Sequence, residues 1–391
     1  MHPNCLFYIT SILALGVTQT AAVHQRQPSK RQDFFDYCST LLPSPSPRST
    51  QAPGSSTLWL LEDTFEGKTF FDSFDFFNET DPTNGSVQYV DRAHAFNKSL
   101  AYVTDNNKII MKGDNTSWLP NGQFRESVRI QGRNKYHTGL FILDLDKAPW
   151  GCGIWPAFWT IGDGRWPCFG EIDIIEGVHD NQHNQVAWHT APGCTLNTTT
   201  NFTGSPVMMN GQPHSDCNGL LPGNAGCGII EWSRASYGPF FDAQGGGVYA
   251  MKWDEDGISV WSFYRAAVPQ NIFDGNPNPL TWGNPVARLD SSQCDPLRFF
   301  SNHSVIFDIT FCGDWAGNSY ATSGCPGSCP DRLMDPTNFI NATWIINSLK
   351  VYRKTVLTGK TSNDAPSLQL YYWPAMTWIG GALLGIGLLF R

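Results

Sequence analysis

The stretch Gly170-Glu171-Ile172-Asp173-Ile174-Ile175-Glu176-Gly177 places three acidic residues inside an apolar run bounded by glycines. Buried strands seldom hold carboxylates, because a desolvated charge is costly unless it is paired or used in chemistry. In a regular strand Glu171 and Asp173 share one face, whereas Glu176 points to the other. One extra residue in a bulge at Ile174-Ile175 would bring all three acids to one face. The stretch therefore predicts a strand that presents a row of carboxylates to a groove, suited to acid/base and nucleophilic chemistry.

The rest of the chain has the pattern of an all-β protein. Charged residues make up only 15% of the chain, and Gly, Pro, Asn and Asp separate short runs rich in aromatic and β-branched residues. This pattern predicts a β-sandwich or barrel. A jelly-roll sandwich of two curved antiparallel sheets with a concave cleft would expose a row of side chains to a linear polymer. Residues 249–261 predict a hairpin with its turn at Asp256-Gly257. The expected strands are residues 58–61, 100–103, 108–112, 139–145, 185–190, 247–253, 258–264, 304–311 and 344–352.

The chain is expected to hold one folded domain, at residues 57–356, because no internal repeat or second change of composition interrupts it. Residues 1–22 have the short apolar core and small residues of a secretory signal. Residues 23–31 then form an expected propeptide that ends at the dibasic pair Lys30-Arg31. Residues 32–56 are rich in Pro and Ser, and Pro43 to Pro47 predict an extended linker.

The C-terminal residues 357–391 have the pattern of a lipid-anchor (GPI-type) signal. Small and polar residues around Asn363 precede a spacer and an apolar run from Trp378 to Phe390. Asn363, or its neighbour Ser362, is the expected attachment residue. The alternative is a terminal transmembrane helix over 373–390, which is slightly shorter than the roughly 20 residues that span a bilayer. Both interpretations place the protein at the outer face of the plasma membrane or in the cell wall.

The cysteines and glycosylation motifs agree with a secreted glycoprotein. Eleven cysteines are present, and ten remain once Cys5 leaves with the signal, an even number that predicts disulfides without defining their pairing. The formal charge of −8 and the lack of a basic cluster argue against nucleic acid as a partner, and a monomer is expected. Eight asparagines lie in acceptor motifs: Asn78, Asn84, Asn97, Asn115, Asn197, Asn201, Asn302 and Asn341.

Tryptophans gather immediately before the acidic strand. The chain holds fifteen, and Trp150, Trp155, Trp159 and Trp166 precede Glu171. Sugar rings have apolar faces that stack on indoles, so tryptophans beside acidic and polar groups suit a carbohydrate groove. The alternative is that many of them fill the core. The position of Trp159 and Trp166 just ahead of the acids favours stacking for these two.

Three stretches together carry a family resemblance. Trp155-Pro156-Ala157-Phe158-Trp159, the acidic stretch 170–177 and Trp188-His189-Thr190-Ala191-Pro192-Gly193-Cys194 resemble glycoside hydrolase family sixteen, in its fungal laminarinase/lichenase-like branch of endo-1,3(4)-β-glucanases. The resemblance extends over about 57–355. It implies a β-jelly-roll with a long cleft, and hydrolysis of β-1,3 or mixed β-1,3/1,4 glucans with retention at the anomeric carbon.

The resemblance also implies roles for individual residues. Glu171 matches the nucleophile, Glu176 the general acid/base and Asp173 an assisting carboxylate between them. Mutual repulsion among three acids should raise at least one pKa, which favours a protonated Glu176 beside a charged Glu171. Substrate-binding positions are matched by Trp159, Trp166, His189, Trp315 and Arg129.

Two other functions remain as alternatives. A cell-wall glucan transglycosylase would also act beside surface glucan, but such relatives have one residue fewer between the Asp and the second Glu, which favours hydrolysis here. A non-catalytic β-glucan-binding module would be expected to lack one or both glutamates. No cofactor or metal is predicted, because His179, His183 and His189 lack ligand spacing, while a structural calcium stays open.

Overall fold

The structure is a computed structural model that describes residues 37–38, 40–44 and 56–357. The predicted signal, propeptide, anchor and attachment residue Asn363 lie outside the described residues. Within the described part of the chain, no helix is long and apolar enough to cross a membrane.

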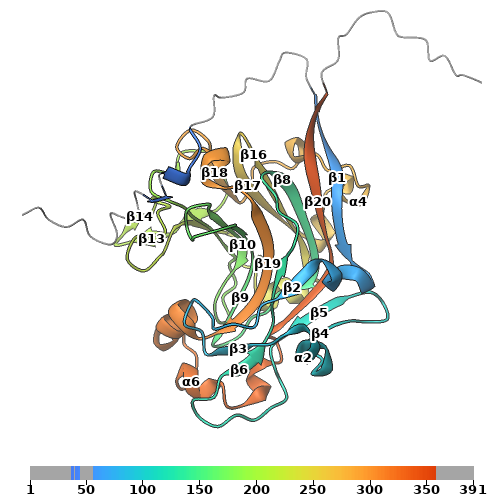
Figure 1. Ribbon diagram of the computed structural model, residues 1–391, viewed down its shortest axis with the longest axis vertical. Coiled ribbons are helices and arrows are strands. Elements are labelled where there is room, and N and C mark those ends of the chain that lie inside the picture. Colours follow the sequence, from blue (N-terminus) through green and yellow to red (C-terminus); the bar gives the residue numbers. More distant parts are fainter. Residues whose placement is uncertain (1–36, 39, 45–55, 358–391) are drawn as a thin grey trace, which may run out of the picture.

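Two eight-stranded antiparallel sheets face each other (Figure 1). The back sheet has the order β18 (Ala287–Asp290), β17 (Gly257–Tyr264), β16 (Gly247–Asp254), β8 (Gly139–Lys147), β20 (Thr343–Leu357), β5 (Ile109–Lys112) and β4 (Ala101–Val103), with β1 (Ser56–Glu66) paired to β20. The site sheet has the order β12 (Ser205–Pro206), β15 (Cys227–Ile230), β11 (Gln185–His189), β10 (Glu171–Glu176), β9 (Ile154–Gly162), β19 (His303–Phe311), β7 (Arg129–Gly132) and β2 (Phe74–Phe76). The predicted all-β sandwich is confirmed.

Short elements complete the fold. Strand β3 (Val87–Tyr89) pairs in parallel with β6 (Arg125–Ser127), and β13 (Met208–Met209) pairs with β14 (Gln212–Pro213). Within residues 56–357, the α-helices are α2 (Arg92–Asn97), α3 (Pro239–Ala243), α4 (Gln270–Phe273), α5 (Pro296–Phe299) and α6 (Cys329–Arg332). The tighter or wider helical turns are η1 (Gly67–Ser73), η2 (Arg265–Ala267), η3 (Pro279–Thr281), η4 (Gly313–Gly317), η5 (Tyr320–Thr322) and η6 (Pro336–Phe339).

The core between the sheets is aromatic and aliphatic. From the site sheet, Phe158 of β9 and Phe307 of β19 stack with ring centroids 4.6 Å apart. Phe307 also meets Trp344 of β20 edge to face at 5.7 Å, which joins the two sheets. The three isoleucines of β10 are fully buried in this core. Their burial turns the acids of β10 toward the opposite, solvent-facing side of the site sheet.

The predicted hairpin is present, with a small difference at its turn. β16 pairs with β17 from Gly247↔Tyr264 to Asp254↔Gly257, so the connecting residues are Glu255 and Asp256. Gly257 is a paired residue with φ +132°, and a Cβ atom there would lie 2.4 Å from the Leu289 carbonyl oxygen. Glycine is therefore required here because the backbone packs closely against β18 and has a positive φ, and not because the residue is at the centre of the turn.

All ten predicted cysteines form disulfides, which confirms the expectation and supplies the pairing. The bonds are Cys38–Cys168, Cys152–Cys325, Cys194–Cys294, Cys217–Cys227 and Cys312–Cys329. The first joins residues 130 apart in sequence and ties the N-terminal segment to the loop before β10. That loop carries Trp166, so the N-terminal segment is covalently linked to the neighbourhood of the acids.

Candidate active site

The predicted bulge in β10 is present and aligns the three acids. Between Asp173 and Glu176, β10 advances three residues while β11 advances two, from Ala187 to Gln185. Because partners two residues apart on β11 share a face, Asp173 and Glu176 also share one. Glu171 lies two residues before Asp173 in regular pairing. The extra residue thus places all three carboxylates on the exposed face of the site sheet.

Asn184 holds the bulge from the side. A bulge leaves backbone groups without ladder partners. The Asn184 side chain satisfies two of them, since its Oδ1 accepts from the Glu176 N–H at 3.0 Å and its Nδ2 donates to the Ile174 carbonyl at 2.9 Å. Asn184 is fully buried, and its own N–H donates to Ser236 Oγ. This residue was not predicted from the sequence, because an isolated Asn between strands carries no local signal for this role.

Two residues of β9, Trp155 and Ala157, form the surroundings of the Glu176 side chain. The Trp155 indole Nε1 donates to Oε1 of Glu176 at 2.8 Å. Directly opposite Glu176 on β9 is Ala157, whose small side chain leaves space above the sheet. Trp155 in turn meets Trp315 of η4 edge to face, with centroids 5.9 Å apart. The predicted substrate-binding residue Trp315 therefore lies close to the acid/base candidate Glu176. Trp155 also belongs to the site, although the sequence analysis named it only as part of the motif 155–159 and assigned it no role.

Glu171 and Asp173 meet His189 of β11. The Trp166 indole Nε1 donates to Oε2 of Glu171 at 2.9 Å. The Nε2 atom of His189, the residue directly opposite Glu171, lies 3.3 Å from Oδ2 of Asp173 and 3.8 Å from Oε1 of Glu171. The predicted residues Trp166 and His189 are thus both gathered at the acids.

Burial dominates the electrostatics of Glu171. Desolvation raises its pKa to about 8, and the Asp173 carboxylate adds to this rise. His189, the Trp166 N–H and Arg129 act in the opposite direction, because each favours the charged carboxylate. Burial thus raises the pKa of Glu171 as well as that of Glu176, and the division into a charged Glu171 and a protonated Glu176 stays a prediction.

Burial also raises the pKa of the other two acids. The pKa of Glu176 lies well above its ordinary value because of desolvation and then Asp173, while the Trp155 hydrogen bond lowers it. Desolvation followed by the charge of Asp308 raises the pKa of Asp173 to about 8. A protonated Glu176 is the state that a general acid needs.

Arg129 and Trp159 lie next to the acids on the same sheet. Trp159 pairs with Asp173 and donates from Nε1 to Asp308 Oδ2 at 3.0 Å. The Arg129 guanidinium lies over the Trp159 ring, 5.0 Å from its centroid, and over the ring of Phe77 at 4.6 Å. Trp159 is only 9% exposed. Its ring is thus largely covered, so that it supports the site floor rather than presenting an open stacking face.

Strand register shows a continuous floor on both sides of the acids. One row of mutually paired residues crosses six strands as Ile230, Gln185, Glu176, Ala157, Asp308 and Arg129. Five strand spacings correspond to about 24 Å. Ala157, Asp308 and Arg129 of this row are buried, so the row is accessible mainly at Glu176, Gln185 and Ile230.

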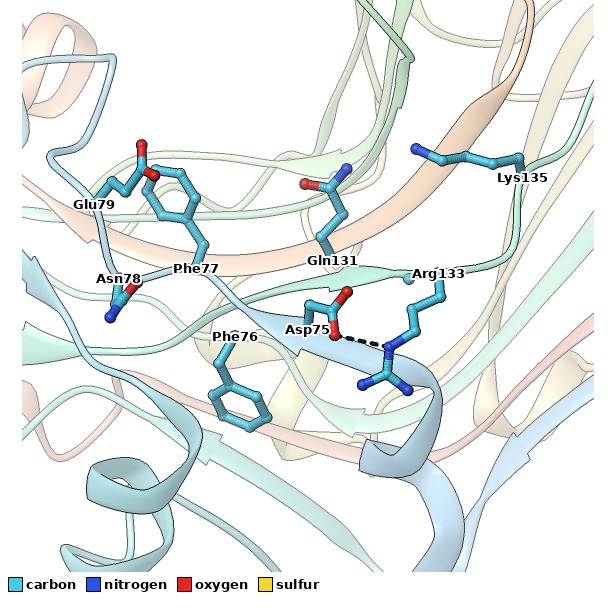
Figure 2. Close-up of a pocket in the computed structure, with 9 residues that line it drawn as sticks. Asp75, Phe76, Phe77, Asn78, Glu79, Gln131, Arg133 and Lys135 are labelled. Carbon is cyan, nitrogen blue, oxygen red and sulfur yellow. Dashed lines mark hydrogen bonds and ion pairs between the residues drawn. The ribbon is translucent and has the colours of Figure 1, made fainter.

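Two hollows open on this floor. One of about 260 Å³ lies beside Glu176 and is lined by Gln185, His183, Ile230 and Trp315, among others. The other, of about 470 Å³, lies at the β2–β7 edge. Figure 2 shows Gln131, Glu79, Arg133 and Lys135 around this second hollow, with Asp75 paired to Arg133 at 2.7 Å. Polar side chains of both signs line it, which suits a ligand rich in hydroxyl groups.

Within the described residues, one group of side chains has metal-ligand geometry, and it is made of Glu171, Asp173 and His189 themselves. Its three ligand atoms lie within 4.8 Å of one another. His179 and His183 do not join it. His179 accepts from the Gly153 N–H and contacts Ser319, and His183 Nδ1 donates to the Glu231 carbonyl. Both have structural partners.

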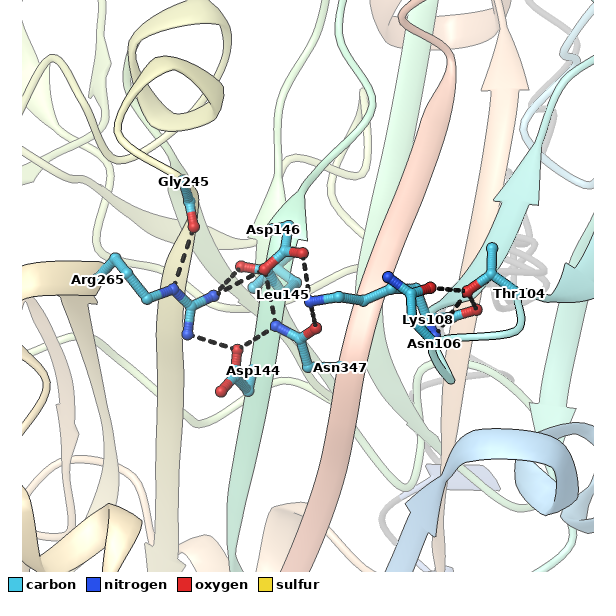
Figure 3. Close-up of polar contacts among 9 residues, drawn as sticks. All are labelled: Thr104, Asn106, Lys108, Asp144, Leu145, Asp146, Gly245, Arg265 and Asn347. Atoms are coloured by element: carbon cyan, nitrogen blue, oxygen red, sulfur yellow. Dashed lines mark hydrogen bonds and ion pairs between the residues drawn. The ribbon is translucent and has the colours of Figure 1, made fainter.

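A second acidic pair lies on the far face of the back sheet and is neutralised by cations (Figure 3). Arg265 donates to Asp144 at 2.7 Å and to Asp146 at 3.2 Å, and Lys108 donates to Asp146 at 2.6 Å. Asn347 Nδ2 donates to both carboxylates, which links β8 to β20. This network stabilises the strand order of the back sheet.

None of the eight glycosylation-motif asparagines is buried. Asn78 lines the hollow at the β2–β7 edge. Asn84 donates from Nδ2 to both carboxylate oxygens of Asp314, at 3.1 and 3.0 Å. Their glycosylation stays a prediction.

Paired carboxylates on the solvent-facing side of a β-sandwich sheet, with hollows on either side, are typical of a glycoside hydrolase, and comparison with known proteins gives the family. Residues 74–352 match the XgeA-like, catalytic GH16 domain. A probable glycosidase of Schizosaccharomyces pombe is 45% identical over 74% of this chain and 68% of its own length. A probable endo-1,3(4)-β-glucanase of Aspergillus fumigatus is 40% identical over 78% of this chain. The match spans about half of that relative, 47% of its length.

Comparison with solved structures gives the same family. GH16 laminarinase 16A from Phanerochaete chrysosporium, with β-glucans in donor and acceptor sites, is 40% identical, with a TM-score of 0.72 over 76% of this chain and all of that one. An elongating GH family 16 β-1,3-glucosyltransferase is 38% identical, with a TM-score of 0.70 over 75% of this chain and all of that one. The chain belongs to glycoside hydrolase family sixteen, as the sequence motifs predicted.

Proposed function

We propose that the protein is a retaining endo-hydrolase of β-1,3 or mixed β-1,3/1,4 glucans. The observation that carries the proposal is the bulged strand β10, which aligns Glu171, Asp173 and Glu176 on one face of the site sheet. One hollow lies beside Glu176 on the β11–β15 side of the acids and the other at the β2–β7 edge on the opposite side, an arrangement that suits attack within a polymer rather than at its end. The names of the relatives support the substrate class.

The reaction proceeds in two displacements. Glu171 attacks the anomeric carbon while Glu176 donates its proton to the leaving glycosidic oxygen. Glu176, now charged, then takes a proton from water, whose oxygen displaces the Glu171 carboxylate. Trp155 and Trp166 each hold one glutamate through an indole N–H, which fixes the direction of its carboxylate.

Asp173 accounts for how Glu171 becomes a nucleophile although burial raises its pKa to about 8. Asp173 also has a raised pKa, so it holds a proton near neutral pH. A protonated Asp173 no longer repels negative charge on Glu171. Among the three acids, Glu171 then carries the negative charge, stabilised by His189, Trp166 and Arg129.

The test is the release of reducing ends from laminarin and lichenan by the purified protein, with xyloglucan as a third substrate. Glu171→Ala should lower the rate at least about a thousandfold while the protein stays folded, since the nucleophile is lost. The exposed Glu66→Ala is the matched control. Full activity of the Glu171 variant would refute the proposed chemistry.

Azide separates the two roles with an activated aryl β-glucoside oligomer. In Glu171→Ala, azide enters the vacated position and yields an α-glycosyl azide. In Glu176→Ala, azide attacks the glycosyl-enzyme and yields a β-glycosyl azide. Exchanged products would reverse the assignment.

Transglycosylation is a second candidate, favoured by the similarity to the elongating glucosyltransferase. Product chains longer than the substrate at high oligosaccharide concentration would support it. Release of shorter chains alone would support hydrolysis.

We also propose that the protein is exported, glycosylated and held at the cell surface as a monomer. Five disulfides support export, because such bonds persist in oxidising compartments. Release of the protein from intact cells by a phospholipase that cleaves GPI anchors tests the attachment.

A further inference from the structure

The hollow at the β2–β7 edge lies on the same face of the site sheet as the acids. One row of paired residues crosses this sheet as Asp173, Trp159, Ile306, Gln131 and Asp75. Directly paired residues of neighbouring antiparallel strands point to the same face. Gln131 and Asp75 line the hollow, and Gln131 lies three strand spacings, or about 14 Å, from Asp173. A polymer that extends along the sheet from the acids in this direction therefore reaches the hollow.

An asparagine with a glycosylation motif lies in the wall of this hollow. Asn78 is the second residue after β2 and begins the motif Asn78-Glu79-Thr80. Its side chain is exposed, and it lines the hollow together with Glu79. Figure 2 shows these two residues at one end of the hollow and Lys135 at the other. The other seven motif asparagines line neither of the two hollows.

The Asn78 amide nitrogen is open to the attachment of a glycan. Among the described residues, none forms a hydrogen bond with the Asn78 side chain. By contrast, the amide nitrogens of three other motif asparagines each donate to a neighbouring side chain, and these are Asn84, Asn197 and Asn302. A glycan on Asn78 therefore replaces no contact within the described part of the chain.

The lining of the hollow suits an oligosaccharide. Gln131 offers an amide, while Glu79 and Lys135 offer an acceptor and a donor, so that hydroxyl and acetamido groups find partners of both kinds. Two acidic and two basic side chains line the hollow, and their charges balance, which suits an uncharged ligand. The half-buried Phe77 ring adds an apolar surface for the C–H face of a sugar.

A glycan attached at Asn78 reaches the hollow without a separate association step. A short covalent tether gives an effective concentration on the order of millimolar. Contacts too weak to hold a free oligosaccharide can therefore hold the attached one. The tethered glycan also competes with any polymer that extends into the same hollow.

We propose that the N-linked glycan of Asn78 folds back into the hollow at the β2–β7 edge and closes that end of the site sheet. The glycan then limits how far a glucan can extend from the acids in this direction. Docking rests on the proposed export and glycosylation, and the effect on glucan rests on the proposed hydrolase activity. The two parts therefore need separate measurements.

The first measurement concerns docking and needs no enzyme activity. Glycopeptide mass spectrometry of the protein secreted from a eukaryotic host should show that Asn78 is occupied. An endoglycosidase that cuts within the N-acetylglucosamine pair should release the Asn78 glycan from the folded protein at least about tenfold more slowly than the glycans of the exposed Asn97 and Asn201. Denaturation should abolish this difference. Gln131→Leu removes an amide from the hollow and should speed release at Asn78 alone.

The second measurement concerns the glucan. Asn78→Gln and Thr80→Ala both remove the glycan, but only the first changes the asparagine. Both should lower KM for laminarin about three- to tenfold, because the tethered competitor is lost. KM for laminaritetraose should stay unchanged, since so short a chain bound across the acids ends before the hollow. Asn97→Gln is the matched control and should follow the wild type on both substrates.

Each result decides one part of the proposal. An unoccupied Asn78, or release at Asn78 as fast as at Asn97 and Asn201, would overturn docking. Slow release with an unchanged KM for laminarin in both glycan-free variants would overturn the closure of the sheet. A wild type that is inactive on every glucan would overturn the proposed hydrolase function, while the release rates would still decide whether the glycan is docked.

Discussion

The buried side chain of Asn184 accepts the backbone N–H of Glu176 at 3.0 Å, while its amide nitrogen donates to Ile174 on the other side of the bulge. One amide therefore satisfies both backbone groups that the extra residue of β10 displaces. The orientation of the Glu176 side chain therefore depends on Asn184, although the Asn184 side chain contacts none of the three carboxylates.

Asn184→Ala should misplace Glu176 and lower kcat by about tenfold to a hundredfold, because small errors of position are costly in catalysis. Unfolding free energy should fall by about 1–3 kcal/mol, since two buried backbone groups lose their partners. Steady-state kinetics and denaturant unfolding measure both effects. Asn106→Ala, in an exposed turn, is the control, and equal kcat in both variants would contradict a positioning role.

Trp155→Phe should move the alkaline limb of the pH–activity profile to higher pH. The Trp155 N–H favours the charged form of Glu176 and so lowers its pKa. Without that hydrogen bond the pKa of Glu176 rises, and the acid catalyst stays protonated to higher pH. Trp315→Phe keeps the hydrogen bond and changes only the neighbouring ring. A shift toward lower pH in Trp155→Phe would be the opposite of this expectation.

Glu231→Gln should weaken the pH dependence of stability. Burial raises the pKa of Glu231 to about 8, so between pH 4.5 and 8 the folded protein holds a proton that the unfolded chain releases. Its contribution to stability is complete below pH 4.5 and is lost as pH rises toward 8. Thermal unfolding from pH 5 to 8 should therefore decline less in Glu231→Gln than in the wild type. The exposed Glu66→Gln should follow the wild type.

Removal of the Cys38–Cys168 disulfide should affect both stability and the site. The chain-entropy estimate is up to about 5 kcal/mol for this 130-residue loop, against about 3 kcal/mol for the 10-residue loop of Cys217–Cys227. Cys168 lies two residues from Trp166, whose indole holds Glu171. The Cys38→Ser, Cys168→Ser double variant should thus raise KM for laminarin as well as lower the melting temperature. The Cys217→Ser, Cys227→Ser double variant should lower the melting temperature less. Equal KM values in the two double variants would show that the Cys38–Cys168 disulfide does not influence the site.

Much of the site could be predicted from local sequence. The spacing of Glu171, Asp173 and Glu176 among isoleucines already required a bulge, because strand alternation is a property of neighbouring residues. The flanking motifs named Trp159, Trp166 and His189, and the structure gathers all three around the acids. An even set of ten cysteines predicted complete pairing, which the five disulfides confirm.

Long-range pairing decided the rest. Which cysteines bond, and that Asn184 spans the bulge, depend on contacts between strands that no local pattern encodes. The pKa of Glu171 depends on burial, a property of the whole fold that the pattern of charges along the chain does not encode. The position of Ile230 in line with Glu176 likewise follows only from the register that carries this row across β11 to β15. The alternation of residues along the chain thus determined strand β10 and the positions of its three acids. The pairing of strands that are distant in sequence determined the burial and the hydrogen-bond partners of those acids.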